Sequence, residues 1–240
     1  MCYYTSVNIK QLDFIRKLQL PNQGIPIPIP APVVNGFLFP KMNVITAPKV
    51  LEGMQWGLIP SWVKGADQAL DIRSKTLNAR FDTLHSKPSF RSAFKHRRCL
   101  VPVTGFFEWR DVAGKKYPYY IRHATSELIS LAGIHESWTD LETGEHVRTF
   151  SVVTTDANPF MARIHNTKLR MPLILDESSE QIWLSSEELT KEETRALMHR
   201  CEVGVLRAHP VGKGLQKAGP DASVEALKEV IYPELLFDPI

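Results

Sequence analysis

Cys2, which directly follows the initiator methionine, has the most distinctive chemical potential in this chain. Once Met1 is removed, Cys2 carries a free α-amine and a thiol on adjacent carbons, a 1,2-aminothiol. Such a pair can capture an aldehyde, or it can serve as a nucleophile together with its own base. A small residue at position 2 is also common for reasons unrelated to catalysis, so MC alone leaves both interpretations open.

Glu108 and His165 have acid–base chemistry and lie in apolar surroundings. GFFEWR places Glu108 between Phe107 and Trp109 on a predicted strand. Burial there would raise the pKa of the carboxyl toward neutrality, whereas strand alternation would instead point the carboxylate into water. His165, in RIHNTKLRMPLIL, titrates near neutrality, although a lone histidine is commonly a hydrogen-bonded structural residue.

Two stretches could bind an anion or position a ligand. LNARFD contains Asn78, whose amide offers both a donor and an acceptor, and Arg80, which is a surface residue in the simplest interpretation. The basic run KHRR at 95–98 ends in Arg98 and follows Arg91 by one helical turn. Such a run suits phosphates, although most basic runs are solvated surface.

Composition and motif content limit the other functions. A net charge of +3 and a sequence pI near 8.7 permit nucleic-acid binding through a local patch but do not require it. Cys2, Cys99 and Cys201 have no zinc-ligand spacing, and no nucleotide-binding glycine motif occurs, so we expect no metal and no cofactor. The cysteine usage predicts a reducing cytoplasm, and no apolar run approaches the roughly 20 residues that span a membrane.

Strand-like runs occupy the middle of the chain, between Met42 and Thr155. VITAPKV, GMQWGLIP, RRCLVPV, YPYYIR, LISLAGI and TFSVVTT are short, rich in β-formers and separated by Gly, Pro or polar turns. Trp62, in WGLIPSW, has two possible roles. It could pack in the core, which is the commoner case, or it could serve as a platform on which unstacked bases lie. The pattern predicts an α+β fold with a mixed or antiparallel, β-barrel-like core flanked by helices.

Helical patterns lie mainly outside this region. Residues 7–20 and 223–232 are predicted to be short helices, and Thr190 with Glu193 has the spacing of a capping box. No linker or repeat divides the chain. We therefore expect a single domain over residues 1–240, with its motif-bearing core ending near residue 211.

Taken in order, the motifs of this chain resemble those of one protein family. They are MC, WGLIPSW, LNAR, RRCLVPVTGFFEW, PYYI, LAGI, TTDAN, and IH followed by RMPLIL. Each motif is weak alone, whereas the ordered set is highly specific and runs from Cys2 to about Val211. The chain is similar to the SRAP family, the SOS response-associated peptidases or abasic-site processing proteins.

The resemblance implies a function and a site. The N-terminal cysteine of the family, exposed by loss of the methionine, reacts with abasic sites in single-stranded DNA and forms a covalent crosslink that shields the lesion. The nucleophile maps to Cys2, the carboxylate to Glu108, the histidine to His165 and the asparagine to Asn78. The expected DNA contacts are Arg80, Trp62, Arg91, Arg98, Arg170, Tyr3 and Tyr4. We expect a cytoplasmic monomer that associates with the nucleoid when it is bound to DNA.

Two motifs depart from the family pattern. CYY replaces the common CGR, so Tyr4 stands where an arginine is usual and could stack on a base instead. IHNTKLRMP is three residues longer than the usual IHxRMP, which lengthens the loop between His165 and Arg170.

The expected chemistry is formation of a thiazolidine. His165 assists opening of the abasic sugar to its aldehyde, which the α-amine of Cys2 attacks while Asn78 holds the amine. Glu108 donates the proton with which water leaves, and the Cys2 thiol then closes the ring. The intermediate imine also permits strand cleavage as a side reaction, an abasic-site lyase activity.

Two other classes of function remain open from the sequence. In an N-terminal-nucleophile hydrolase or peptidase, which could also remove Met1 itself, the Cys2 thiol attacks an amide with its own amine as base. In a non-catalytic DNA-binding module, Cys2 would be dispensable.

Overall fold

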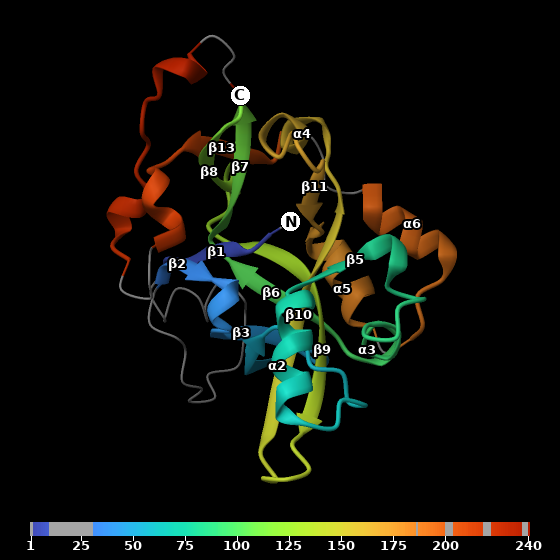
Figure 1. Cartoon of the computed structure of the whole chain (residues 1–240). Coiled ribbons are helices and arrows are strands. Elements are labelled where there is room, and N and C mark those ends of the chain that lie inside the picture. Colours follow the sequence, from blue (N-terminus) through green and yellow to red (C-terminus); the bar gives the residue numbers. More distant parts are fainter. Residues whose placement is uncertain (1, 10–30, 186, 200–203, 218–221, 237–239) are drawn as a thin grey trace.

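The computed structural model describes residues 2–9, 31–185, 187–199, 204–217, 222–236 and 240, and within them two β-sheets form the centre of the molecule (Figure 1). The first sheet has five strands in the order β13-β8-β7-β1-β2, all antiparallel. These strands are β1 Tyr4–Val7, β2 Ala31–Asn35, β7 Gly105–Val112, β8 Lys115–His123 and β13 Leu206–Pro210.

The second sheet closes on itself. Its strands are β3 Lys41–Thr46, β4 Val50–Trp56, β5 Asn78–Arg80, β6 Arg98–Val103, β9 Ile129–Thr139, β10 His146–Asp156, β11 Arg170–Pro172 and β12 Ile174–Leu175. Strands β10, β4, β3, β6 and β9 follow one another, and β9 also pairs with β10, so these five form a closed barrel without a free edge. β10 runs parallel to β4 and β5, and the other pairs are antiparallel. The expected single α+β domain with a barrel-like core is confirmed.

Short helices surround the two sheets (Figure 1). The α-helices are α2 Ala66–Lys75, α3 Arg91–His96, α4 Pro159–Ile164, α5 Glu177–Leu184 and α6 Lys191–His199. The 3₁₀ helices are η1 Gly36–Leu38, η2 Phe81–Thr83, η3 Lys213–Lys217, η4 Val224–Leu227 and η5 Pro233–Leu235. No described helix combines the length and the apolar character that crossing a bilayer requires.

Side-chain caps fix where two of these helices begin. Asn158, the last residue of TTDAN, accepts a hydrogen bond from the Met161 amide at 2.9 Å and starts α4. Thr190 and Glu193 exchange hydrogen bonds with each other's backbone amides, which confirms the capping box before α6. The start of α4 matters for function because this helix ends directly at His165.

Both faces of the strands that carry the motifs are covered. On β7, Phe106 packs into the main hydrophobic cluster, which also contains Cys2, whereas Phe107 packs on the opposite face with Tyr4. On β6, Val101 belongs to the main cluster and Leu100 to a second one beneath the helices. A strand with two covered faces has no solvent side, so alternation along it does not separate buried from exposed residues.

Of the two expected terminal helices, the one over 7–20 falls mostly outside the described residues, and the one over 223–232 is not observed. Val7 ends β1, and residues 10–20 lie outside the described part of the chain. In the segment 223–232 only η4 is helical: Lys228 after it has extended dihedral angles, and residues 229–232 have no regular secondary structure. Val230 donates to the carbonyl of Pro210, the last residue of β13, at 2.9 Å, so its amide is bonded to another segment and not within a helix.

Candidate functional site

Cys2 lies in the interior at the start of β1. Its side chain is fully buried in the main hydrophobic cluster, and its Sγ lies 3.8 Å from the carbonyl oxygen of Tyr4. Antiparallel pairing of β1 with β7 aligns Tyr4 with Phe107, and this register, continued by one residue, brings Tyr3 level with Glu108. Burial is the main cause that raises the pKa of the Cys2 thiol, and the negative charge of Glu108 raises it further. The thiol is therefore protonated at neutral pH.

Glu108 is a buried carboxyl in the middle of β7. Only 2% of its surface is exposed, which excludes the alternative that strand alternation points it into water. Burial raises the pKa of Glu108 from an ordinary 4.5 to about 7. A carboxyl with this pKa is present in both protonation states at neutral pH, so it can give and take a proton during a reaction.

His165 caps the C-terminus of α4 and faces Glu108. Its Nδ1 lies 2.7 Å from the Arg170 carbonyl oxygen, which can only accept, so Nδ1 carries the hydrogen. The other nitrogen, Nε2, lies 3.7 Å from Glu108 Oε2. Burial is the main cause that lowers the pKa of His165 to about 4, so the ring is neutral and Nε2 presents a lone pair toward the carboxyl.

The lengthened loop after His165 is anchored to β7. Leu169 donates its backbone amide to the His165 carbonyl at 2.9 Å, which folds the loop back on itself. Asn166 accepts from the Asp111 amide at 3.0 Å and donates to the Asp111 carbonyl at 2.8 Å. These two bonds tie the loop to the strand that carries Glu108. Sequence reasoning missed Asn166, and its only signal was its place beside the histidine in a loop of unusual length.

Asn78 has a buried amide that makes no hydrogen bond within the described residues. Both its Oδ1 and its Nδ2 are buried and unpartnered. β5 pairs in parallel with β10 and aligns Asn78 with Val152, a member of the same cluster as Cys2. A buried amide without partners costs free energy, and ligand groups that supply the missing bonds remove that cost.

Four of the expected DNA contacts lie where a strand of DNA can reach them. Arg80 and Arg91 are exposed, and Arg80 pairs with Asp82 at 2.8 Å. Trp62 is 49% exposed. Tyr3 is half-buried, with its ring 4.7 Å from that of Phe37.

Three expected DNA contacts lie in the interior instead. Tyr4 packs its ring 5.2 Å from that of Trp109. Arg170 donates to Asp156 and to the Thr154 carbonyl, both at 2.8 Å. Tyr4, expected to stack on a base, and Arg98 and Arg170, expected to contact DNA, are all buried, so none of the three presents an exposed side chain.

Arg98 joins two parts of the fold. Its guanidinium donates to five backbone carbonyls, which belong to Phe94, Lys95, Trp183, Ser185 and Glu187. It therefore holds the end of α3 against the chain at the end of α5. The charge is solvated by peptide dipoles and not by water.

We expect Arg98→Ala to lower the free energy of unfolding by about 3 kcal/mol or more, because it leaves several buried carbonyls without donors. Equilibrium urea denaturation measures the loss. Arg91→Ala, which removes an exposed arginine seven residues earlier, should stay within about 0.5 kcal/mol of the wild type. Equal stability of the two variants would show that the five bonds of Arg98 contribute nothing net.

Within the described part of the chain, no three His, Cys, Asp or Glu side chains are grouped so that they could hold a metal ion. The groups that the site offers are a thiol, a carboxyl of raised pKa, a neutral imidazole and an unpartnered amide.

Comparison with known proteins adds a family and a fold. The family model described as SOS response associated peptidase (SRAP) matches residues 17–218. The abasic site processing protein YoqW of Bacillus subtilis is 33% identical over 178 residues, which cover 72% of this chain and 76% of that protein. The abasic site processing protein HMCES of Gallus gallus is 34% identical over 183 residues, 68% of this chain and 53% of that protein.

Two solved structures have the same architecture. A crystal structure of a Bacteroides thetaiotaomicron protein has a TM-score of 0.87 at 36% identity, covering 96% of this chain and all of that one. A Bordetella bronchiseptica protein has a TM-score of 0.75 at 21% identity, covering 88% of this chain and all of that one. The second likeness shows the fold alone.

Proposed function

Because the chain belongs to the SOS response associated peptidase (SRAP) family, we propose that it processes abasic sites in single-stranded DNA by capturing them covalently on Cys2. The observation that carries the proposal is the position of Glu108, with a pKa of about 7, beside the thiol of Cys2 and 3.7 Å from the imidazole of His165. The names of the bacterial and vertebrate relatives support an abasic site as the substrate.

The α-amine of Cys2 makes the first bond. An abasic deoxyribose exists as a closed hemiacetal and an open aldehyde, and neutral His165 can accept the hemiacetal hydroxyl proton through Nε2 and return it to the ring oxygen as the ring opens. Once Met1 has been removed, the amine adds to the aldehyde carbon and gives a carbinolamine. An α-amine has an ordinary pKa of about 7.7–8.0, so part of it is unprotonated at neutral pH. The buried thiol stays protonated and does not compete at this step.

Loss of water and ring closure follow. Glu108 gives its proton to the carbinolamine hydroxyl, which leaves as water, and the carboxylate takes back the N–H proton, so that a neutral imine is formed. The sulfur of Cys2 then bonds to the imine carbon, and the thiol proton ends on the nitrogen. The product is a five-membered thiazolidine, and the whole sequence releases one water. Asn78 hydrogen-bonds the amine during these steps and so gains the partners that its buried amide lacks.

The imine is a branch point between two outcomes. It acidifies the neighbouring sugar carbon, so β-elimination can break the DNA strand before the thiol closes the ring. The thiol and the imine nitrogen lie on adjacent carbons of one residue, which gives ring closure a high effective concentration. Crosslinking is therefore the main activity, and strand cleavage is a side activity.

Hydrolysis of an amide by Cys2 fits the site less well. A cysteine hydrolase attacks with a thiolate, whereas burial and the charge of Glu108 both raise the pKa of this thiol. Self-catalysed removal of Met1 would face the same obstacle. It remains the alternative activity, and protein that loses Met1 by itself but gives no adduct in the mass measurement below would favour it.

DNA binding is proposed to be independent of sequence, because an abasic site has no base to read. Arg80 and Arg91 bind phosphates, so affinity should fall as salt rises. Trp62 and Tyr3 stack on neighbouring bases, and Trp62 favours single strands where it occupies the space of an opposing strand. The protein acts as a cytoplasmic monomer that joins the nucleoid through DNA, without a metal or cofactor.

Intact-mass spectrometry tests this function directly. The protein is mixed with a single-stranded oligonucleotide that carries one abasic site and is then denatured. We expect protein that lacks Met1 to give one adduct, whose mass is the sum of both components minus one water. The same oligonucleotide without the lesion serves as the control. No adduct from protein that begins at Cys2 would refute covalent capture.

A further inference from the structure

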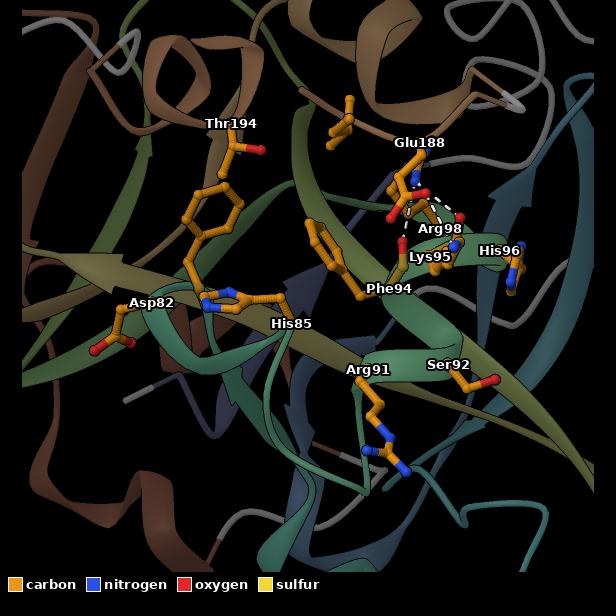
Figure 2. A pocket seen from close by; sticks show the side chains of 12 residues that line it. Asp82, His85, Arg91, Ser92, Phe94, Lys95, His96, Arg98, Glu188 and Thr194 are labelled. Carbon is orange, nitrogen blue, oxygen red and sulfur yellow. Dashed lines mark hydrogen bonds and ion pairs between the residues drawn. The ribbon is translucent and has the colours of Figure 1, made fainter. Parts of the chain in front are cut away.

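A cavity of about 860 Å³ is lined in part by the segment that directly follows Asn78 in the chain, and it has no role in the chemistry above. Figure 2 shows it between the segment that carries Asp82 and His85, the helix α3 with Arg91 and Lys95, and the chain around Glu188. Its volume is within the usual range for small-molecule sites, about 300–1,000 Å³. A nucleotide-sized group fits such a volume.

The cavity combines an aromatic wall with cations at its rim. The ring of Phe94 is half-buried and is braced by Phe81 and Trp183, at 6.3 and 5.9 Å between centroids. The guanidinium of Arg91 is exposed and makes no hydrogen bond or ion pair with the described residues. Phe94 and Arg91 lie one helical turn apart on α3 and both line the cavity, so an aromatic face and an unpaired arginine are available for the base and the phosphate of a nucleotide.

The acidic side chains at the rim do not cancel this charge. Asp82 is paired with Arg80, and Glu188 is paired with Lys95 at 3.0 Å. Each carboxylate is therefore neutralised locally, while Arg91 is left for an incoming anion. His85 and His96 add further donors along the same rim.

The walls of the cavity are fixed relative to each other before any ligand binds. Arg98 donates to the Phe94 and Lys95 carbonyls on one wall and to the Glu187 carbonyl next to Glu188 on the other. Because these donors hold both walls, little ordering is needed on binding, which favours affinity.

The position of the cavity relates it to the proposed site. β5 leads directly from Asn78 into η2, whose Phe81 and Asp82 line the cavity. Four residues of extended chain span at most about 14 Å. A DNA strand covers that distance in a few nucleotides, since its rise is about 3.4 Å per nucleotide in the duplex and more when stretched.

We propose that this cavity holds a nucleotide of the damaged strand, a few positions from the abasic residue, with its base on Phe94 and its phosphate on Arg91. The inference rests on the proposed function, because it takes the abasic nucleotide to lie at Cys2. With the abasic nucleotide at Cys2 and a neighbouring nucleotide in the cavity, the strand is held at two points. These two points set the direction in which the strand crosses the protein. The second point also explains how a lesion without a base can be bound, since a neighbouring base supplies the stacking.

The test measures binding without capture. Oligonucleotides carry a tetrahydrofuran analogue of the abasic site, which has no aldehyde, and fluorescence anisotropy gives Kd. One oligonucleotide extends on both sides of the analogue, and two others stop just beyond it on the 5′ or on the 3′ side. The variants are Arg91→Ala and Phe94→Leu, with Arg122→Ala as the matched control, because Arg122 is an exposed arginine on β8 in the other sheet.

We expect Arg91→Ala to raise Kd for the full oligonucleotide about tenfold and to reduce the slope of log K against log salt by about one. Phe94→Leu should raise Kd about fivefold or more, because a stacked base loses its platform. Both effects should vanish on one of the two shortened oligonucleotides, the one without the nucleotide that enters the cavity. Arg122→Ala should bind every oligonucleotide as the wild type does.

Three results would overturn the inference. Arg91→Ala could bind all oligonucleotides as tightly as the wild type, or it could lose the same factor on both shortened ones, as a general charge effect would. Tight binding of a free deoxynucleoside monophosphate, lost in Arg91→Ala without any effect on DNA, would make the cavity a separate nucleotide site. Covalent capture of an aldehyde-bearing oligonucleotide by the wild type is scored independently. Failure of the proposed function is thereby distinguished from failure of this inference.

Discussion

Cys2→Ser is expected to reduce the heat-stable DNA adduct on the order of a hundredfold while leaving more nicked DNA. The serine variant keeps the α-amine, so it still forms the imine with the abasic aldehyde. A hydroxyl is a much weaker nucleophile than a thiol and closes the analogous ring far less readily. The imine therefore persists, and it partitions toward hydrolysis and β-elimination. The thiol normally wins this competition because its effective concentration at the imine carbon is very high, on the order of 10⁵ M or more.

Denaturing gel electrophoresis of labelled abasic single-stranded DNA, with and without heating, measures both products. Cys99→Ala is the matched control, because it removes the other thiol that the structure describes as buried and free, on β6. It should form as much adduct as the wild type. Equal amounts of heat-stable adduct from Cys2→Ser and the wild type would refute thiazolidine formation, while leaving DNA binding untouched.

The strands of the barrel could be predicted from the sequence, whereas the exposure of residues on them could not. GFFEWR alternates, and alternation normally separates a buried face from a solvated one. In the structure, Phe106 and Phe107 pack on opposite faces of β7 and both are fully buried. What decides the pKa of Glu108 is therefore the cover over the second face. That cover comes from segments far away in the sequence, which local periodicity does not detect.

Arginine side chains show the same limit. Arg98 ends the basic run KHRR and looks like part of a charged surface, but the chain after α5 wraps over it and supplies carbonyl acceptors. Arg91, seven residues earlier, remains exposed. The sequence of charges does not tell which arginine is buried and which is exposed. An arginine can be buried only where carbonyl groups from distant parts of the chain accept its hydrogen bonds.

The residues of the proposed site could be predicted from the resemblance of motifs, whereas their distances from one another are known only from the structure. Cys2, Glu108 and His165 are separated by long stretches of chain, and they meet because β1 pairs with β7 and α4 ends against that strand. The longer loop after His165 could have moved the imidazole away. The bonds of Asn166 to Asp111 show how the added length is held in place, and no local pattern indicates that pairing.

Glu108→Gln is expected to slow adduct formation about a hundredfold with the fold intact, because an amide cannot supply the proton with which water leaves the carbinolamine. The substitution preserves the size of the side chain and removes only the titratable proton. Single-turnover kinetics with excess protein that begins at Cys2 measure the rate. Glu142→Gln, at an exposed loop position, is the control and should react like the wild type.

The pH dependence distinguishes loss of a proton donor from simple damage to the site. In the wild type, the reaction needs Cys2 with an unprotonated amine and Glu108 with a protonated carboxyl. The rate should rise with pH as the amine, with an ordinary pKa of about 7.7–8.0, loses its proton. The protonated fraction of Glu108, whose pKa burial has raised to about 7, falls over the same pH range, so the rate should decline again above the pKa of the amine. The product of the two populations is a bell with its maximum between these pKa values.

In Glu108→Gln the descending limb should disappear, so that the slow rate rises with pH and then levels off. A variant that is slow only because its site is distorted would keep the bell-shaped profile at reduced height. Unchanged kinetics at pH 7 would remove Glu108 from the mechanism altogether. A bell that persists unchanged in the variant would assign the descending limb to another group. The raised pKa of Glu108, set by burial on a strand covered on both faces, is thus the property that the profile measures.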